Sequence, residues 1–330
     1  MELTTTRLVL RPYAESDIDA VHAYGSCPEN VRYMIWGPNT EKETAEFLAE
    51  CLSRQGEVPR LKHDFAITLR ENGHPIGGCG IYLDKEQTEG MLGWILHRDF
   101  WGHGYVPEAA QALMHFGFDT LRLHRVWASC NAENTASWRV MEKCGMRREA
   151  RFVKARFGRV GEERRWYDEF RYALLEDERI EPQHASGSMR VRRIMYGSAE
   201  YAAELALRDV ILRKPLGMTL FTEDLCAEKD DIHLGAFGDG ALLGVLVLTP
   251  QEKTVRMRQV AVDAGRQRGG MGTALVDAAE RLAAALGYIR MELHARETAA
   301  GFYTRLGYAA EGEPFAEVGI PHRAMAKTLL

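Results

Sequence analysis

Two glycine-rich stretches, each directly before an apolar, helix-like run, constrain the fold of this chain most strongly. The first reads WGHGYVPEA at residues 101–109, and the second reads GRQRGGMGTALV at residues 265–276. Glycines let a backbone approach an anion, and the free N–H groups at the start of a helix stabilise its charge. The second stretch lacks the lysine of a P-loop and the third glycine of a dinucleotide fingerprint, but it fits the pattern Q-x-x-G-x-G.

The spacing of these glycines indicates that the chain holds two copies of one fold. The glycines of the two loops align at an offset of 168 residues, and the ends of two later helices align at 162, pairing Gly102 with Gly270, Gly104 with Gly272, and Gly145 with Gly307. A duplication keeps such offsets close, whereas unrelated glycine loops would not. We therefore predict two domains of about 150–180 residues each.

The stretch EDERIEPQHASGSM, at residues 176–189, separates the two copies. It is charged, poor in apolar residues and rich in Pro, Ser and Gly, which is typical of a linker. It predicts a first domain at 1–177, a linker at 178–188 and a second domain at 189–330. Each domain alternates apolar strands with amphipathic helices in the same order, so the fold class is α/β (α+β).

Composition excludes several classes of protein. The net charge of −5 and the lack of a basic excess in either half argue against binding to nucleic acid. No apolar run approaches the length of about 20 residues that a membrane span needs. The six cysteines form no C-x-x-C pair, which favours reduced thiols, a cytoplasmic location and no structural metal.

With these motifs in order, both halves resemble the GNAT superfamily of acetyl-CoA-dependent N-acetyltransferases. In the second half the resemblance rests on VAVDAGRQRGGMGTAL and AAGFYTRLGY, which are similar to small bacterial members. In the first half it rests on TTRLVLRPYAESD, WGHGYVPEA and LHRVWASCNAENTASWRVMEKCGMRREA, which resemble the ribosomal-protein N-terminal acetyltransferases. The resemblance implies two tandem domains, each a mixed, mostly antiparallel twisted sheet flanked by helices, with acetyl-CoA as cofactor.

The resemblance also implies where acetyl-CoA binds in the second domain. A strand at 254–262 would offer backbone groups to the pantetheine amides, and the glycine loop would hold the pyrophosphate. The residues implied are Val260, Ala261, Val262, Gln267, Arg268, Gly269, Gly270, Met271, Gly272 and Thr273.

The corresponding residues of the first domain follow in the same way. They are Trp94, Ile95 and Leu96 on a strand, Gly102, His103, Gly104 and Tyr105 in the loop, and Asn134 of the N-x-x-N-x-x-S pattern. Asn134 also has the sequence context of a helix N-cap. Asp99 occupies the place aligned with Gln267, where the family usually has Gln or Arg, and this is a departure from the pattern.

The two domains differ in the residue that would protonate the leaving thiolate. Tyr303 matches the family's tyrosine for this role, although a tyrosine beside Phe302 is also typical of a core position. Met141 stands opposite Tyr303 and cannot donate a proton. Ser137 lies one helical turn earlier on the same face, so we predict Ser137 as the corresponding group.

The general base and the acceptor stay open. Glu292, His294, Glu317 and His322 are candidates in the second domain, Asp168 and Glu108 in the first, and a bound water is an alternative in both. The resemblance implies attack by a primary amine, of a small molecule or a peptide, in a ternary complex. In the alternative hypothesis one domain is catalytic and the other only binds acetyl-CoA or supports its neighbour. The sequence is also compatible with a homodimer.

Overall fold

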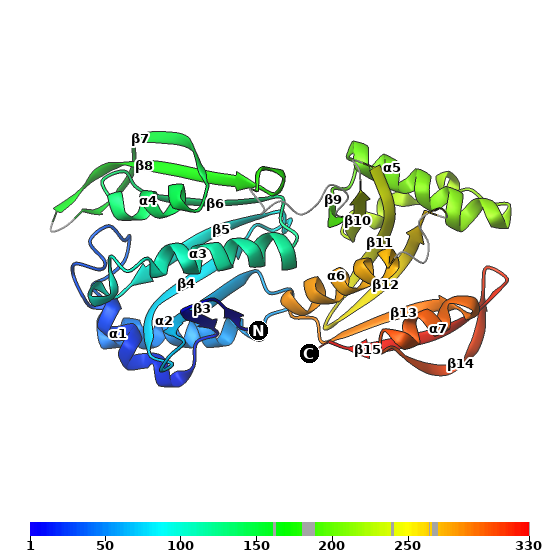
Figure 1. Ribbon diagram of the computed structural model, residues 1–330, viewed down its shortest axis with the longest axis horizontal. Coiled ribbons are helices and arrows are strands. Elements are labelled where there is room, and N and C mark those ends of the chain that lie inside the picture. The colour runs from blue at the N-terminus through cyan, green and yellow to red at the C-terminus, as the bar shows by residue number, and fades with distance from the viewer. Residues whose placement is uncertain (161–162, 180–188, 239–240, 264, 266–269, 330) are drawn as a thin grey trace. The chain divides into compact units, whose positions relative to one another are not determined.

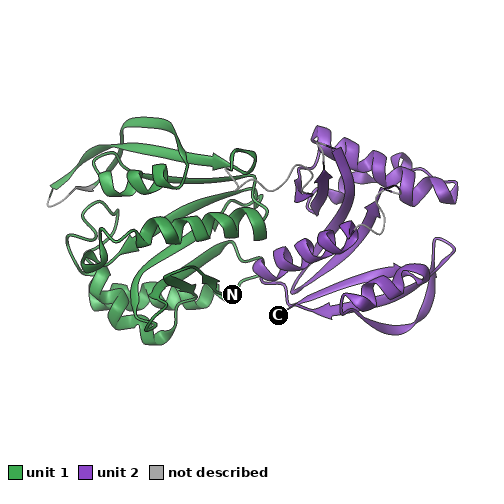
Figure 2. Ribbon diagram, viewed as in Figure 1, with its two compact units in different colours: residues 1–181 green, residues 182–330 purple. Residues whose placement is uncertain are grey.

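The computed structural model describes all residues except 161–162, 180–188, 239–240, 264, 266–269 and 330. The chain divides into two compact units, residues 1–181 and 182–330, shown in two colours in Figure 2. Each unit is a single sheet with helices on both faces (Figure 1). The sheet order is β1-β2-β3-β4-β5-β6-β8-β7 in the first unit and β14-β15-β13-β12-β11-β10-β9 in the second.

The first unit builds an eight-stranded sheet. Its strands are β1 (Leu3–Thr4), β2 (Leu8–Arg11), β3 (Lys62–Leu69), β4 (Pro75–Leu83), β5 (Glu89–Leu96), β6 (Arg125–Asn131), β7 (Arg147–Val160) and β8 (Glu163–Leu175). Its helices are α1 (Ile18–Gly25), α2 (Glu41–Arg54), α3 (Tyr105–His115), extended by a π-helical turn at Phe116–Thr120, and α4 (Thr135–Lys143).

The second unit repeats this order with seven strands. They are β9 (Arg190–Ile194), β10 (Ile232–Gly238), β11 (Ala241–Gln251), β12 (Thr254–Val262), β13 (Arg290–Arg296), β14 (Ala309–Glu317) and β15 (Ile320–Thr328). The helices are α5 (Ala199–Arg208), which continues into a π-helical turn at Asp209–Arg213, α6 (Met271–Ala285) and α7 (Glu297–Arg305).

Burial explains why the helices take opposite faces of the second sheet. Val245 and Ala261 pack with Tyr201 and Leu205 of α5. Gly244, the neighbour of Val245 on β11, instead faces Met271 and Leu275 of α6. Since successive side chains of a strand point to opposite faces, α5 and α6 lie on different sides of the sheet.

Both sheets are antiparallel except for one central pair, and in each sheet this pair separates partway along. β5 and β6 are paired in parallel only over Glu89–Met91 and Arg125–Trp127. β12 and β13 are paired in parallel only over Thr254–Met257 and Arg290–Leu293. Beyond these residues each strand continues and its described strand pairing is with its outer neighbour, so each described sheet opens into a V.

The duplication is confirmed, but the register of the glycine loops is corrected. The N-caps of α3 and α6 are Gly104 and Gly270, with φ of 79° and 82°. These left-handed residues are equivalent, so the loops align at an offset of 166 rather than 168, and Gly272 lies inside α6. Gly145 and Gly307 both follow a helix with positive φ, which confirms the offset of 162.

Candidate active site

The V of the second sheet contains the strand residues predicted to bind the cofactor. Val260, Ala261 and Val262 lie on the arm of β12 beyond its last pairing with β13. One extra residue bulges this arm, because Val245 pairs with Ala261 while Val247 pairs with Arg258. Gln259 in the bulge has a φ of 54°, an unusual conformation for a residue with a side chain, which tends to occur at functional sites.

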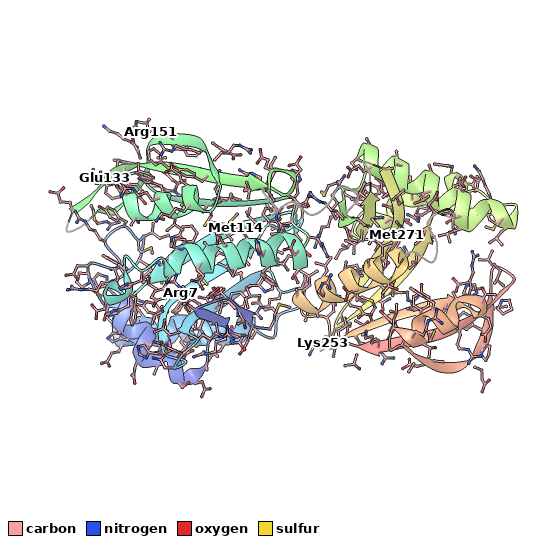
Figure 3. The ribbon with its side chains drawn as sticks, viewed as in Figure 1. Arg7, Met114, Glu133, Arg151, Lys253 and Met271 are labelled. Carbon is pink, nitrogen blue, oxygen red and sulfur yellow. The ribbon has the colours of Figure 1, made fainter. Side chains whose placement is uncertain are left out.

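The start of α6 provides the predicted anion cradle. Gly270 takes the left-handed conformation that glycine tolerates best, and a Cβ atom there would meet no other atom within 4 Å. Gly272 has a different role, since a Cβ atom there would lie 3.3 Å from the ring of Phe302. Met271, labelled in Figure 3 at the N-terminal end of α6, is buried, and Thr273 is exposed. Gln267, Arg268 and Gly269 lie outside the described residues.

A groove of about 400 Å³ runs from this cradle along α6. It is lined by Gly270, Thr273, Asp277, Glu280, Leu306 and Lys327, among others. The Lys327 ammonium donates to Glu280 at 2.5 Å and places a cation in the groove. Only the open backbone at Gly270 suits an anion, because the Lys327 charge is paired with Glu280 and Asp277 also lines the groove.

The first sheet repeats the V but not the bulge. Trp94, Ile95 and Leu96 lie on the separated arm of β5, which pairs with β4 without a register shift. Gly102, His103 and Gly104 are exposed in front of α3, and the His103 ring stacks on Tyr105. The corrected register also moves the position aligned with Gln267 from Asp99 to Trp101.

Arg7 is a residue at this first cradle that the sequence did not single out. Its guanidinium donates to the carbonyl of His103 at 2.9 Å and lies over the Tyr105 ring (Figure 3 labels Arg7). It also binds Glu108, which accepts three further hydrogen bonds, from the Thr5 hydroxyl and from the backbone and Nε of Arg7. The segment TTRLVLRP was a signal for the family, but nothing in it pointed to a contact about a hundred residues away.

These contacts change the interpretation of both base candidates in the first domain. Burial would raise the pKa of Glu108, but its bonds to Thr5 and Arg7 outweigh burial and lower it. Asp168 accepts from the Lys154 N–H and the Arg151 guanidinium, which also lowers its pKa. Both carboxylates therefore join segments of the chain together.

Tyr303 and Met141 occupy equivalent positions near the ends of α7 and α4. The backbone carbonyls of both accept from the residue five positions later, at 3.1 Å and 3.0 Å. Met141 is fully buried, and Tyr303 is 7% exposed. Burial raises the pKa of Tyr303 to about 12, and no described residue hydrogen-bonds its hydroxyl. The ring is packed like a core residue, while the hydroxyl is left available as a donor.

Ser137 is placed differently from Tyr303. It is half-buried in the first turn of α4, where Asn134 caps the helix by accepting from its N–H at 3.1 Å. This confirms the structural role predicted for Asn134. Cys130 lies on the separated arm of β6, where burial raises the pKa of its thiol and the nearby Ser137 hydroxyl opposes that rise.

Of the four base candidates in the second domain, the structure joins two directly. His294 Nδ1 lies 2.9 Å from Glu317 Oε2. His322 contacts the carbonyl of Ile320, and the Phe315 ring lies between the two histidines. Glu292 is bound to Arg290 instead.

Comparison with known proteins agrees with this geometry. Residues 7–147 and residues 214–329 each match a model described as an acetyltransferase (GNAT) domain. The chain is 34% identical over 178 residues to the uncharacterized N-acetyltransferase YnaD of Bacillus subtilis, which covers 54% of this chain and 99% of that protein. It is 34% identical over 151 residues to the uncharacterized N-acetyltransferase p20 of Bacillus licheniformis, covering 44% and 83%.

A solved structure of a GNAT-family acetyltransferase from Bacillus anthracis is similar as well. It shares 33% identity and aligns with a TM-score of 0.49, covering 54% of this chain and all of that one. No described helix is long and apolar enough to cross a membrane. The chain belongs to the GNAT family of N-acetyltransferases and carries two of its domains in tandem.

Proposed function

We propose that the protein transfers an acetyl group from acetyl-CoA to a primary amine, and that the second domain carries out this reaction. The observation that carries the proposal is the Tyr303 hydroxyl. It has no hydrogen bond to the described residues, and its raised pKa keeps the proton on it at neutral pH. The equivalent Met141 of the first domain offers no proton.

The backbone around Tyr303 fits acetyl-CoA. The inner edge of β12 at Val260 and Ala261 lies beyond the pairing with β13, and its N–H and C=O groups match the amides of pantetheine. The left-handed Gly270 and the free N–H groups at the start of α6 match the pyrophosphate. Phe302 packs near Gly272, so the helix that carries Tyr303 lies against this cradle.

The chemistry follows from these placements. The amine attacks the thioester carbonyl in a ternary complex, and the bond from carbon to sulfur breaks. The thiolate then takes the proton of the Tyr303 hydroxyl. A proton donor that is already aimed at the leaving group lowers the barrier by general acid catalysis, which contributes about 10²–10⁴-fold in rate.

The first domain supports two versions of the proposal. It has the V and the glycine cradle that acetyl-CoA needs, so we propose that it binds the cofactor too. The Ser137 hydroxyl would protonate the thiolate if this domain is active. In the alternative version the first domain only binds acetyl-CoA or supports the second.

The test compares two substitutions in the full chain. Turnover of acetyl-CoA is measured by thiol release with a panel of amino acids, polyamines, aminoglycosides and peptide N-termini. Tyr303→Phe keeps the ring and should lower kcat by roughly 10²-fold with little change in the KM for acetyl-CoA. Tyr288→Phe, which removes a hydroxyl from another buried ring of the same domain, is the control.

Ser137→Ala decides which domain does the chemistry. If the second domain carries the reaction, Ser137→Ala keeps most of the turnover of the unmodified chain. It loses at most the small turnover that the first domain contributes and that remains in Tyr303→Phe. Full turnover in Tyr303→Phe together with its loss in Ser137→Ala would place catalysis in the first domain and overturn the proposal.

A further inference from the structure

The pair formed by His294 and Glu317 lies on the face of the second sheet opposite to α6. Met291, Leu293 and Ala295 are the buried residues of β13, so His294 between them points to the other face. His294 is also the first residue of β13 beyond its pairing with β12. It therefore stands where the V begins to open, on the face that α5 covers.

The segment after α5 contacts both arms of the V on this face. Arg213 donates to the Gln259 side chain on the β12 arm at 3.5 Å. The carbonyl of the preceding residue, Leu212, accepts from Arg296 on the β13 arm at 3.4 Å. Two consecutive residues thus contact both arms of the V, and His294 is two residues from Arg296 on the same face.

The hydrogen bond to Glu317 fixes how His294 can act. A carboxylate at Nδ1 holds the ring proton on that nitrogen in the neutral form, so Nε2 is left with a free lone pair. Both side chains are partly exposed, at 36% and 50%, and so are accessible to an incoming molecule. The charged groups around the ring are Glu317 on β14, His322 on β15, and Glu292 and Arg296 on β13.

We infer that His294 is the general base that takes a proton from the acceptor amine, and that Glu317 is its positioning residue. The inference rests on the proposed function, because it requires chemistry in the second domain. The acceptor reaches the V from the α5 face as an ammonium ion, and one N–H proton passes to His294 Nε2. The neutral nitrogen then attacks the thioester carbon.

The remaining proton transfers involve Tyr303, His294 and the solvent. Tyr303 protonates the departing thiolate, and the second proton lost from the nitrogen restores the tyrosine through solvent. The proton on His294 is released to solvent before the next turnover. Base and acid are separate side chains on β13 and α7, so each can be tested alone.

The first domain does not repeat this arrangement. β6 and β13 each pair with the last strand of their domain, and the final pair in each case makes Asn131 equivalent to Arg296. Ser129 is then equivalent to His294. The residue opposite Ser129 is Arg171, whose guanidinium lies between the rings of Trp127 and Phe152. A serine beside an arginine does not act as a base near neutral pH, so the assignment is specific to the second domain.

The first measurement follows activity in the full chain, in a Gly104→Val background that blocks the first cradle. The rate is measured against pH with acetyl-CoA and the most active amine of the panel. His294→Gln should lower kcat/KM for the amine by about 10²-fold and change its dependence on pH. Glu317→Gln should lower kcat more than it raises KM, and Glu317→Asp should recover part of the loss. The exposed His115→Gln is the control.

The second measurement does not depend on activity. Ring ¹⁵N spectra of the unmodified protein, assigned by comparison with His294→Gln or by labelling, should show His294 with its proton on Nδ1. Glu317→Gln should mix the two tautomers. A proton on Nε2 in the unmodified protein, or an unchanged pH profile in His294→Gln, would overturn the inference.

The outcomes also separate this inference from the proposed function. Loss of turnover in Tyr303→Phe with an intact profile in His294→Gln would contradict the base alone. Full turnover in both variants would contradict catalysis by the second domain and with it the base.

Discussion

The two domains share the backbone features of the proposed cofactor site and differ in the side chains that would donate or accept protons. Both sheets open into a V at the same pair of strands, and both cradles begin with a left-handed glycine, Gly104 or Gly270. At the positions equivalent to Tyr303 and His294, however, the first domain has Met141 and Ser129. The difference teaches that this duplicated acetyltransferase fold keeps its backbone geometry more readily than the side chains at these two positions.

The two domains also differ in the polar groups buried in their cores. The first buries Asp64, which accepts from Tyr82 at 2.9 Å and pairs with Arg54 at 3.2 Å. The second buries a larger network on α5, β10 and the 3₁₀ turn at Leu225–Glu228. In it Arg208 pairs with Glu204 and Glu228, and His233 contacts Glu204. Such networks make each domain sensitive to different perturbations.

The largest expected effect is the loss of stability in Arg208→Met. This change leaves Glu204 and Glu228 buried without their cation, which costs about 3–5 kcal/mol of unfolding free energy. All six tryptophans lie in residues 1–181, so tryptophan fluorescence follows unfolding of the first domain, while circular dichroism follows both. Unfolding of the second domain is then the transition that circular dichroism detects and tryptophan fluorescence does not. Only this transition should move to a lower denaturant concentration in Arg208→Met.

The control for this prediction is Arg281→Met, which removes an exposed ion pair with Asp277 on α6. It should change the same transition by less than about 0.5 kcal/mol. An equal shift of the fluorescence transition in Arg208→Met would show that the domains do not unfold independently.

An effect of intermediate size is expected from pH, which should change the stability of the two domains in opposite directions. Burial, with a smaller contribution from Arg60, lowers the pKa of His63 in the first domain to about 3. In the second domain burial alone would lower the pKa of His233, but its hydrogen bond to Glu204 outweighs burial and raises it. The two histidines therefore respond in opposite ways to acidification.

The signs follow from linkage. His63 has a depressed folded pKa, so its contribution is present above about pH 6.5 and is lost as pH falls, by about 2 kcal/mol at pH 5. His233 has a raised folded pKa, so its contribution is complete below about pH 6.5 and is lost as pH rises. As the pH falls from 8 to 5, the first domain should lose stability, so the fluorescence transition moves to lower denaturant concentration. The transition of the second domain should stay in place or move to higher concentration.

A matched variant checks the assignment to His63. His63→Leu removes the titrating ring, so the fluorescence transition should lose most of its dependence on pH in this window. A dependence that survives in His63→Leu would assign the effect to other groups of the first domain.

Much of the fold was predictable because periodicity and glycines are local signals. The order of strands and helices in both halves, the capping of α4 by Asn134 and the duplication were predicted correctly. The glycine register was wrong by two residues, because sequence shows which residues are glycine but not which one takes the left-handed conformation. The bulge at Gln259 had no sequence signal of its own.

The site was less predictable because its contacts cross long stretches of chain. Sequence proposed His294 and Glu317 separately, and only the pairing of β13, β14 and β15 brings them within 2.9 Å. In the same way, no local pattern connects Arg7 with the loop before α3. Residues such as Gln267 and Arg268 remain predictions, since they lie outside the described residues.

The smallest expected effect concerns what the domains share, and it is the sharpest test of the shared cradle. A Cβ atom at Gly270 would meet no other atom within 4 Å, so Gly270→Val clashes with no neighbour, but it strains the left-handed backbone and projects where the pyrophosphate would approach. Calorimetric titration of the full chain with CoA should show two sites. In Gly270→Val one of them should weaken at least tenfold, which is about 1.4 kcal/mol.

Gly197→Val has the same positive φ and the same open surroundings away from the cradle, and it should keep both sites because its strain is not at the ligand. Gly104→Val should weaken the other site, and the double variant should weaken both. Two sites of full strength in Gly270→Val would mean that the second domain holds its phosphate elsewhere, and the equivalence of the two cradles would fail.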